Sequence, residues 1–192
     1  MDQVKPKGAG KSSFELINTN IFKQMLPIRQ GGVILDLACG KGMYSVFLSQ
    51  LAGPSGLVYA VDLWEEGLGI LEENAREKKI DTIATIKADV TRQIDHIEAH
   101  SLDLCLMATV LHDFKEMNAD RIVLKQVRNL LKPGGRLAIV EFKKMDGPPG
   151  PPEHIRLTPE ETEKMVTAEG FKKVKSADIG DYNYMMTFSS PG

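Results

Sequence analysis

The chain has 192 residues, of which 42% are hydrophobic and 26% charged, with a formal net charge of -2. This composition is typical of one soluble globular domain with a sizeable core. The near-neutral charge disfavours a dedicated nucleic-acid binder, and no apolar run approaches the ~20 residues of a membrane-spanning helix. Residues 1–10 are polar rather than typical of a signal peptide, so we expect a cytoplasmic protein.

The first thirty residues predict an arm followed by a helix. Residues 1–12 are rich in Lys, Pro and Gly, which indicates a flexible arm. Residues 14–25 carry apolar side chains at spacings of three and four, which predicts a helix that ends near Pro27. We expect residues 1–30 to form a candidate lid over a substrate, and residues 31–192 to form the main domain.

From residue 33 onward, apolar runs alternate with amphipathic segments. The runs predict strands over residues 33–38, 57–61, 82–87, 102–108 and 136–142, and the segments predict helices over residues 43–51, 65–78 and 119–131. A polar stretch through His100 has room for a short helix before the fourth strand. Strands that alternate with helices of this length indicate parallel β-α-β units in a doubly wound α/β sheet.

The last fifty residues predict a long loop, a helix and two strands. The loop over residues 143–157 contains a Gly- and Pro-rich tract, and loops of this length are typically functional lids or disordered. Thr158, Pro159 and Glu161 predict the capped start of a helix that runs to Glu169. Residues 172–179 and 182–188 predict an antiparallel hairpin on the sheet edge, which makes seven strands in all, mostly parallel.

Three acidic residues stand at the carboxyl ends of successive predicted strands. These are Asp36, Asp62 and Asp89, and a turn with Gly40 and Gly42 follows the first of them. Ligands of open parallel sheets bind at this edge, and glycines let the backbone come close to them. Asp62 is placed to accept both hydroxyls of a ribose, Asp89 an adenine amino group, and Asp36 a cationic or amino group. Each carboxylate alone could instead cap a helix or close a turn.

The glycine pattern discriminates between nucleotide cofactors. The fingerprint for nicotinamide or flavin dinucleotides has glycines at the positions that Ala38, Gly40 and Met43 occupy here, so two of the three are missing. An acidic residue as early as Asp36 is not part of that fingerprint either. A dinucleotide oxidoreductase is therefore disfavoured.

Five segments, in order and at suitable spacing, resemble the motifs of the class I S-adenosylmethionine-dependent methyltransferases. They are residues 33–42, 58–62, 87–90, 102–114 and 130–142, and they cover roughly residues 30–145. The sequence Val110-Leu111-His112-Asp113-Phe114 is similar to that of the small-molecule methyltransferases of the ubiquinone and menaquinone biosynthesis type. Ala38 departs from the pattern, because many members carry glycine there.

This resemblance implies a Rossmann-like sheet with an antiparallel C-terminal hairpin strand, and S-adenosylmethionine as cofactor. The methyl group would pass by in-line displacement to a nucleophile, leaving S-adenosylhomocysteine. The cofactor-binding residues that it implies are Asp36, Ala38, Gly40, Gly42, Asp62, Leu63, Asp89, Val90, Met107 and Ala108. No metal is expected.

His112 is the candidate general base, with Asp113 as its partner, if the acceptor must lose a proton. The alternative is that His112 packs against the turn and bonds the backbone. His154, in the long loop, could reach the site from a lid. Cys39 and Cys105 have neither zinc nor disulfide spacing and are expected to pack in the interior.

The segment after the fourth strand lacks the Asn/Asp-Pro-Pro-aromatic clamp of nucleic-acid aminomethyltransferases. We therefore expect a small, partly apolar acceptor, no nucleic-acid partner, and a monomer or homodimer. Two alternatives stay open. One is an S-adenosylmethionine-binding accessory or regulatory protein without turnover, and the other is an RNA or protein methyltransferase.

Overall fold

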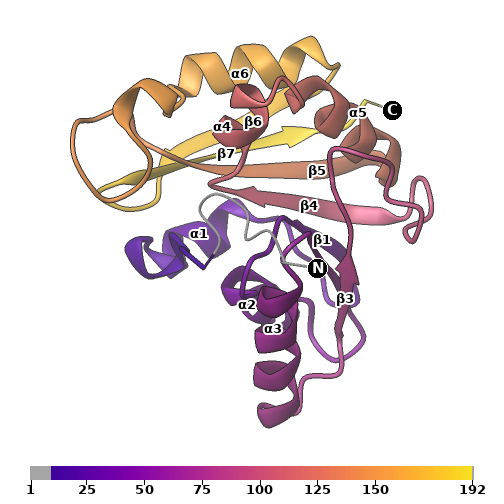
Figure 1. Ribbon diagram of the computed structural model, residues 1–192. Coiled ribbons are helices and arrows are strands. Elements are labelled where there is room, and N and C mark those ends of the chain that lie inside the picture. Colours follow the sequence, from indigo (N-terminus) through magenta and orange to yellow (C-terminus); the bar gives the residue numbers. More distant parts are fainter. Residues whose placement is uncertain (1–9, 192) are drawn as a thin grey trace.

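The computed structural model, described over residues 10–191, is a three-layer α/β sandwich (Figure 1). Its seven-stranded sheet has the order β3-β2-β1-β4-β5-β7-β6, and only β7 is antiparallel to its neighbours. The strands are β1 (Val33–Leu37), β2 (Leu57–Asp62), β3 (Ile83–Lys87), β4 (Leu102–Ala108), β5 (Leu131–Phe142), β6 (Lys172–Asp178) and β7 (Asn183–Ser189). The predicted fold class is confirmed. Residues 1–9, which hold most of the predicted arm, lie outside the described residues.

Helices cover both faces of the sheet. Figure 1 shows α1 (Thr19–Met25), α2 (Met43–Ala52) and α3 (Glu65–Glu77) on one face, and α4 (Leu111–Glu116), α5 (Asp120–Leu130) and α6 (Pro159–Ala168) on the other. Strand β4 contributes side chains to the hydrophobic cores on both faces of the sheet, because alternate residues of a strand point to opposite faces. Leu104 and Leu106 pack in the core under α1 and α2, whereas Cys105 and Met107 pack under α4 and α5. The predicted interior position of Cys105 is therefore confirmed.

The prediction of one helix over residues 14–25 was wrong. The segment is a short 3-10 helix, Phe14–Leu16, followed by the separate helix α1. Asn18 separates them, because its side chain accepts hydrogen bonds from the backbone N–H groups of Asn20 and Ile21 and so caps α1. Asn is a favoured N-cap residue, and this competing signal outweighs the apolar spacing.

Several further elements differ from the sequence prediction. The short helix α4 follows β4 directly and was not predicted, whereas the polar stretch before β4 forms turns rather than a helix. Strand β5 begins at Leu131, five residues earlier than predicted, because Leu131 pairs with Leu102 before the register shifts. The predicted helix over residues 119–131 therefore ends at Leu130.

The C-terminal hairpin is confirmed, but its second strand is internal. Strand β7 inserts between β5 and β6, so only β6 lies at the edge. This explains why residues 184–188 are all buried while residues 172–176 are exposed. Lysines at positions 172, 173 and 175 keep this edge charged, which discourages pairing with other chains.

The loop over residues 143–157 is organised around one buried arginine. Arg156 is only 2% exposed, and its guanidinium lies 5.7 Å from the centre of the Phe142 ring. The guanidinium donates hydrogen bonds to four backbone carbonyls of the same loop, those of Lys143, Gly147, Pro149 and Pro151. A 3-10 turn, Glu153–Ile155, precedes it. The loop is thus folded on itself rather than disordered.

Candidate active site

The strand order reverses between β1 and β4, and a cavity of about 250 Å³ lies at the carboxyl ends of these two strands. Ligand sites of doubly wound sheets lie at this position. Four of the predicted cofactor residues line the cavity: Asp36, Ala38, Gly40 and Ala108. Its wall also includes Gly10, Lys11, Ser12, Glu15, Cys39, Lys41, Met43, Tyr44 and Thr109.

The turn after β1 requires unusual backbone angles. Gly40 and Gly42 have φ values of +58° and +71°, and Ala38 adopts +61° although it carries a Cβ. A Cβ at Gly40 would meet nothing within 4 Å, whereas a Cβ at Gly42 would collide with the Leu71 side chain. Gly40 therefore leaves the cavity open, and Gly42 lets the turn pack on α3.

Asp62 holds this turn against β2. Its Oδ2 accepts the Gly40 N–H at 2.7 Å, and its Oδ1 accepts the Trp64 N–H at 2.8 Å. A carboxylate oxygen has two lone pairs, so each oxygen keeps one acceptor site for a ligand. Asp62 is thus compatible with both the predicted ribose contact and the turn-closing role.

Asp36 lies inside the cavity wall with 1% of its surface exposed. The Ser45 hydroxyl donates to its Oδ2 at 2.5 Å. Burial is the main cause that raises the pKa of the Asp36 carboxyl to about 7, and the nearby Asp62 carboxylate adds to the rise. This carboxyl is therefore partly protonated near neutral pH.

The remaining predicted cofactor residues are more dispersed. The Asp89 carboxylate accepts hydrogen bonds from the Thr91 N–H and hydroxyl, at 3.0 and 2.6 Å, and so closes its own turn. Leu63 is 51% exposed, which suits a wall for a ligand, whereas Val90 and Met107 are buried in the core. Neither Val90 nor Met107 is part of the cavity wall.

His112 is paired with a residue that sequence analysis missed. The Nδ1 atom of His112 lies 2.7 Å from Oε2 of Glu141, and the His112 backbone N–H donates to Oε1 of the same carboxylate at 3.2 Å. The Nε2 atom lies 3.6 Å from Oδ2 of Asp113. Glu141 is fully buried in β5, in the apolar stretch of residues 137–142. A single acidic residue inside such an apolar stretch is the feature of the sequence that could have identified Glu141.

The environment of His112 favours the charged form of its imidazole more than water does. Burial alone would lower the pKa of His112, but the hydrogen bond to Glu141 and the charges of Glu141, Asp113 and Glu116 together raise it above its usual 6.5. The alternative was that His112 packs against the turn and bonds the backbone. It is partly met, since only 5% of the His112 side chain is exposed. The predicted pair of His112 and Asp113 is thus extended by a buried carboxylate.

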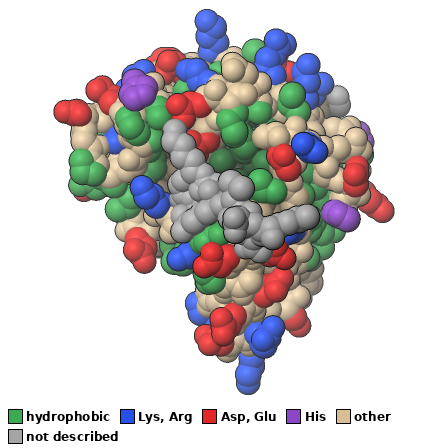
Figure 2. Space-filling view, viewed as in Figure 1, with side chains coloured by type: hydrophobic (Ala, Val, Ile, Leu, Met, Phe, Trp, Pro, Cys, Tyr) green, Lys and Arg blue, Asp and Glu red, His purple; other side chains and the backbone are tan. Residues whose placement is uncertain are grey.

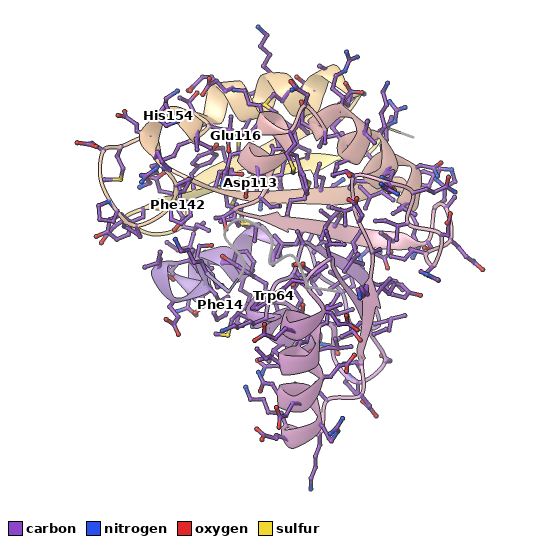
Figure 3. The ribbon with its side chains drawn as sticks, viewed as in Figure 1. Phe14, Trp64, Asp113, Glu116, Phe142 and His154 are labelled. Atoms are coloured by element: carbon purple, nitrogen blue, oxygen red, sulfur yellow. The ribbon has the colours of Figure 1, made fainter. Side chains whose placement is uncertain are left out.

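Residues at the start of the described chain cover one side of the cavity. The Ser13 hydroxyl lies 2.9 Å from the Tyr44 hydroxyl, and the Phe14 ring packs edge-on against Tyr44 at 5.0 Å between centroids. Figure 3 shows Phe14 and Trp64 on the α1–α3 side of the sheet and Asp113 on the α4–α6 side. Tyr44 was missed because its apolar ring fits the helix pattern of residues 43–51.

His154 lies away from the cavity wall, exposed in the 3-10 turn Glu153–Ile155 (Figure 3). Cys39 is half-buried and lines the cavity, so the expectation that it packs in the interior is only partly met. In the part of the chain that the structure describes, no group of three or more His, Cys, Asp or Glu side chains could hold a metal ion. Among the same residues, no helix is long and apolar enough to span a membrane.

Residues 28–188 match the family described as "Methyltransferase domain". The chain belongs to this family. Membership confirms the methyltransferase class expected from the sequence motifs and S-adenosylmethionine as its cofactor. The resemblance to the ubiquinone and menaquinone type is confirmed by two relatives, the demethylmenaquinone methyltransferase of Lactobacillus johnsonii and the ubiquinone/menaquinone biosynthesis C-methyltransferase UbiE of Burkholderia mallei.

The first relative is 27% identical over 164 residues, which cover 85% of this methyltransferase chain and 63% of that protein. The second is 28% identical over 118 residues, which cover 62% and 46%. The chain thus spans less than two thirds of the length of these relatives.

Solved structures agree on the fold. A SAM-dependent methyltransferase from Aquifex aeolicus superposes with a TM-score of 0.83 at 24% identity, covering 96% of this methyltransferase and 95% of that chain. The [4+2]-cyclase SpnF superposes with a TM-score of 0.74 at 15% identity, covering 90% and 80%. One fold therefore serves proteins whose names give different reactions, so the fold alone does not determine the reaction.

Proposed function

We propose that this protein transfers a methyl group from S-adenosylmethionine to a small acceptor with an ionisable hydroxyl. The observation that carries the proposal is the cavity at the β1–β4 switch point, in which Asp36 and the glycine turn meet the end of β4. His112, which is buried against Glu141 of β5, lies at the start of α4, four residues beyond Ala108 at the end of β4.

The residues present fit the proposed cofactor. Gly40 leaves open space where any other residue would place a Cβ, and Asp62 keeps acceptor sites free on both oxygens. Asp36, Ala38, Gly40 and Ala108 would hold the methionine part, and Asp62, Leu63 and Asp89 the adenosine part. When bound, S-adenosylmethionine supplies an electrophilic methyl group on a sulfonium sulfur.

His112 would accept the proton that the acceptor loses. Glu141 bonds Nδ1 and so directs Nε2 toward the other side of the ring, where Asp113 lies. The imidazole is most effective as a base once it is itself deprotonated, at a pH above its raised pKa. Alignment of acceptor and donor in a closed site contributes the larger part of the rate, on the order of 7–11 kcal/mol.

A hydroxylated aromatic ring of the quinol type is the acceptor class that we propose. The names of the relatives, which act in menaquinone and ubiquinone biosynthesis, support this class. The surface supports it too: Figure 2 shows hydrophobic side chains gathered near the centre of the face that carries the site, with acidic side chains beside them. A hydroxyl on such a ring gives His112 a proton to remove.

The segment before α1 would act as the lid over the acceptor. Lys11, Ser12 and Glu15 line the cavity, and Ser13 and Phe14 anchor this segment on Tyr44 of α2. Residues 1–30 would thus shield the site, and residues 31–192 would carry the methyltransferase domain.

The test has two measurements on the full chain. Isothermal titration should show binding of S-adenosylmethionine, weakened about 100-fold or more by Asp62→Ala, because the turn and the proposed ribose contact are lost together. Transfer of a labelled methyl group should then occur to quinols in a panel that also holds amines, thiols, RNA and protein. Absence of binding would refute the proposal. Binding without transfer to any acceptor would favour an accessory protein, and transfer to RNA or protein would favour that class.

A further inference from the structure

A second cavity, of about 420 Å³, opens at the amino ends of β1 and β4, beside residues 132–136 of β5. We call it the amino-end cavity. Strand β1 spans the distance between Gly32 in its wall and Ala38 in the wall of the cavity at the carboxyl ends, which is roughly 20 Å at the rise of a parallel strand. None of the residues proposed to hold the cofactor or to act on the acceptor lines the amino-end cavity.

Strand pairing brings Arg136 to the floor of this cavity. Ile34 of β1 pairs with Leu104 of β4, and Leu104 pairs with Arg136 of β5, so the three residues form one row across the sheet. Ile34 and Leu104 pack in the core under α1 and α2, and paired residues share a face, so Arg136 lies on this face too. Residues 27–32, which lead from α1 into β1, form the opposite wall and bring Arg29 to the same cavity.

The wall has an excess of positive charge. Three basic residues and one acidic residue line it, which gives a net charge of +2, whereas the whole chain carries -2. The acidic residue, Asp103, already has its partners: its Oδ1 accepts Lys132 Nζ at 2.7 Å, and its Oδ2 accepts the Val33 N–H at 2.9 Å. Since Asp103 and Lys132 offset each other, the excess charge belongs to Arg29 and Arg136.

These two guanidinium groups keep most of their hydrogen-bond donors. Arg29 is exposed, and its side chain makes no hydrogen bond or ion pair with any described residue. Arg136 is half-buried and donates from Nη1 to the Gly134 carbonyl at 2.8 Å, while its Nε and Nη2 groups have no partner among the described residues. A guanidinium carries five N–H donors and binds phosphate or carboxylate through two of them at once.

We propose that the amino-end cavity binds a phosphate group, with Arg29 and Arg136 as its binding residues. A phosphate monoester carries a charge of about -1.5 to -2 at neutral pH, which matches the excess charge of the wall better than the single charge of a carboxylate does. The site lies at the opposite end of the sheet from the proposed methyl-donor site, so both can be occupied together. The inference is independent of the proposed function.

Phosphorus nuclear magnetic resonance of inorganic phosphate, titrated with the full chain at constant ionic strength, measures this binding. Arg29→Gln and Arg136→Gln should each weaken phosphate affinity about tenfold or more, because the charge-assisted hydrogen bonds of one guanidinium are lost. Arg29→Gln removes no contact with the described fold, so it tests the site without disturbing the packing. Arg76→Gln, at an exposed position of α3, removes the same charge far from the cavity and is the matched control.

Competing ions test the class of ligand. Sulfate, a dianion of the same shape, should displace phosphate, whereas acetate at the same ionic strength should not. Saturating S-adenosylhomocysteine should leave phosphate bound, because the two cavities lie at opposite ends of β1.

Two further probes distinguish the sources of the phosphate group. Displacement of inorganic phosphate by methyl phosphate would support a small phosphate ester. Sedimentation with phosphatidylcholine vesicles that contain phosphatidic acid, reduced in Arg29→Gln but not in Arg76→Gln, would support a lipid headgroup.

The inference is overturned if inorganic phosphate does not bind, or if Arg29→Gln and Arg136→Gln bind it as tightly as Arg76→Gln. Equal competition by acetate would refute the phosphate class, and displacement by S-adenosylhomocysteine would refute the location.

Discussion

The carboxylate of Glu141 contacts His112 twice, through Nδ1 at 2.7 Å and through the backbone N–H at 3.2 Å. One side chain of β5 thus sets both the orientation of the imidazole and the position of the first turn of α4. Both groups are removed from water, so the pair is stronger than an exposed one and more costly to break.

The pH profile of methyl transfer should report this pair. We expect the rate to rise with pH through the pKa of His112, above 6.5, because the imidazole must lose its proton before it acts as a base. Glu141→Gln removes the charge that raises this pKa, so the midpoint should move to lower pH. His112→Gln should remove the midpoint altogether. An unchanged midpoint in Glu141→Gln would contradict the role of Glu141 as a positioning residue.

Asp36 should make stability depend on pH in an unusual direction. Its pKa is raised from 3.8 to about 7 in the folded state. Its contribution to the free energy of unfolding is therefore fully present below pH 3.8 and is lost as pH rises through 7. Asp36→Asn should therefore have a higher free energy of unfolding than wild type at pH 8, by on the order of 4 kcal/mol, and a smaller excess at pH 5. Urea unfolding at the two pH values measures this difference.

Asp103 is the control for this experiment, because its pKa is shifted in the opposite direction. Burial alone would raise its pKa, but hydrogen bonds from Lys132 and the Val33 N–H lower it overall. Its contribution is therefore present at neutral pH and is lost as pH falls below its ordinary 3.8. Asp103→Asn should lower stability at pH 7 more than in acid. Equal pH slopes in the two variants would refute both assignments.

Ala38 holds a left-handed backbone angle that glycine adopts without strain. Its φ is +61°, and this region costs a non-glycine residue about 1–2 kcal/mol. Ala38→Gly should raise the free energy of unfolding by about 1 kcal/mol and keep cofactor binding. Gly40→Ala is the reciprocal change at φ +58°, and it should lower stability by about 1 kcal/mol and place a methyl group in the cavity. Thermal unfolding and titration measure both effects, and a destabilised Ala38→Gly protein would contradict the strain argument.

Arg156 should govern the order of the loop over residues 143–157. Its planar guanidinium bonds four carbonyls at once, and a lysine ammonium cannot reproduce that geometry. We expect Arg156→Lys to lose about 2–4 kcal/mol of stability and to be cut by protease within the loop. Arg136→Lys, where a single surface carbonyl is bonded, should change neither quantity appreciably. Equal protease resistance in the two variants would refute the role of Arg156.

The sequence alone determined the features that depend on neighbouring residues or on the regular spacing of apolar residues along a strand or helix. Strand β4 was predicted at its observed bounds because a short run in which only Asp103 is polar has few other interpretations. Asp36, Gly40 and Asp62 were brought together in prediction because parallel strands place all their carboxyl ends at one edge. The capping box of Thr158 and Glu161 is also present, since its residues are only three positions apart.

The tertiary structure decided what depends on distant parts of the chain. Glu141 contacts His112 from 29 positions further along the chain. The spacing of apolar residues does not indicate which buried acid packs against which helix. The insertion of β7 beside β5 likewise depends on pairing between strands, which makes β7 internal and leaves β6 exposed. Among the described residues Asp36 has no ion-pair partner, and this depends on the side chains that the neighbouring elements place around it. Composition and spacing identify the acid, whereas only the packing around it sets its pKa.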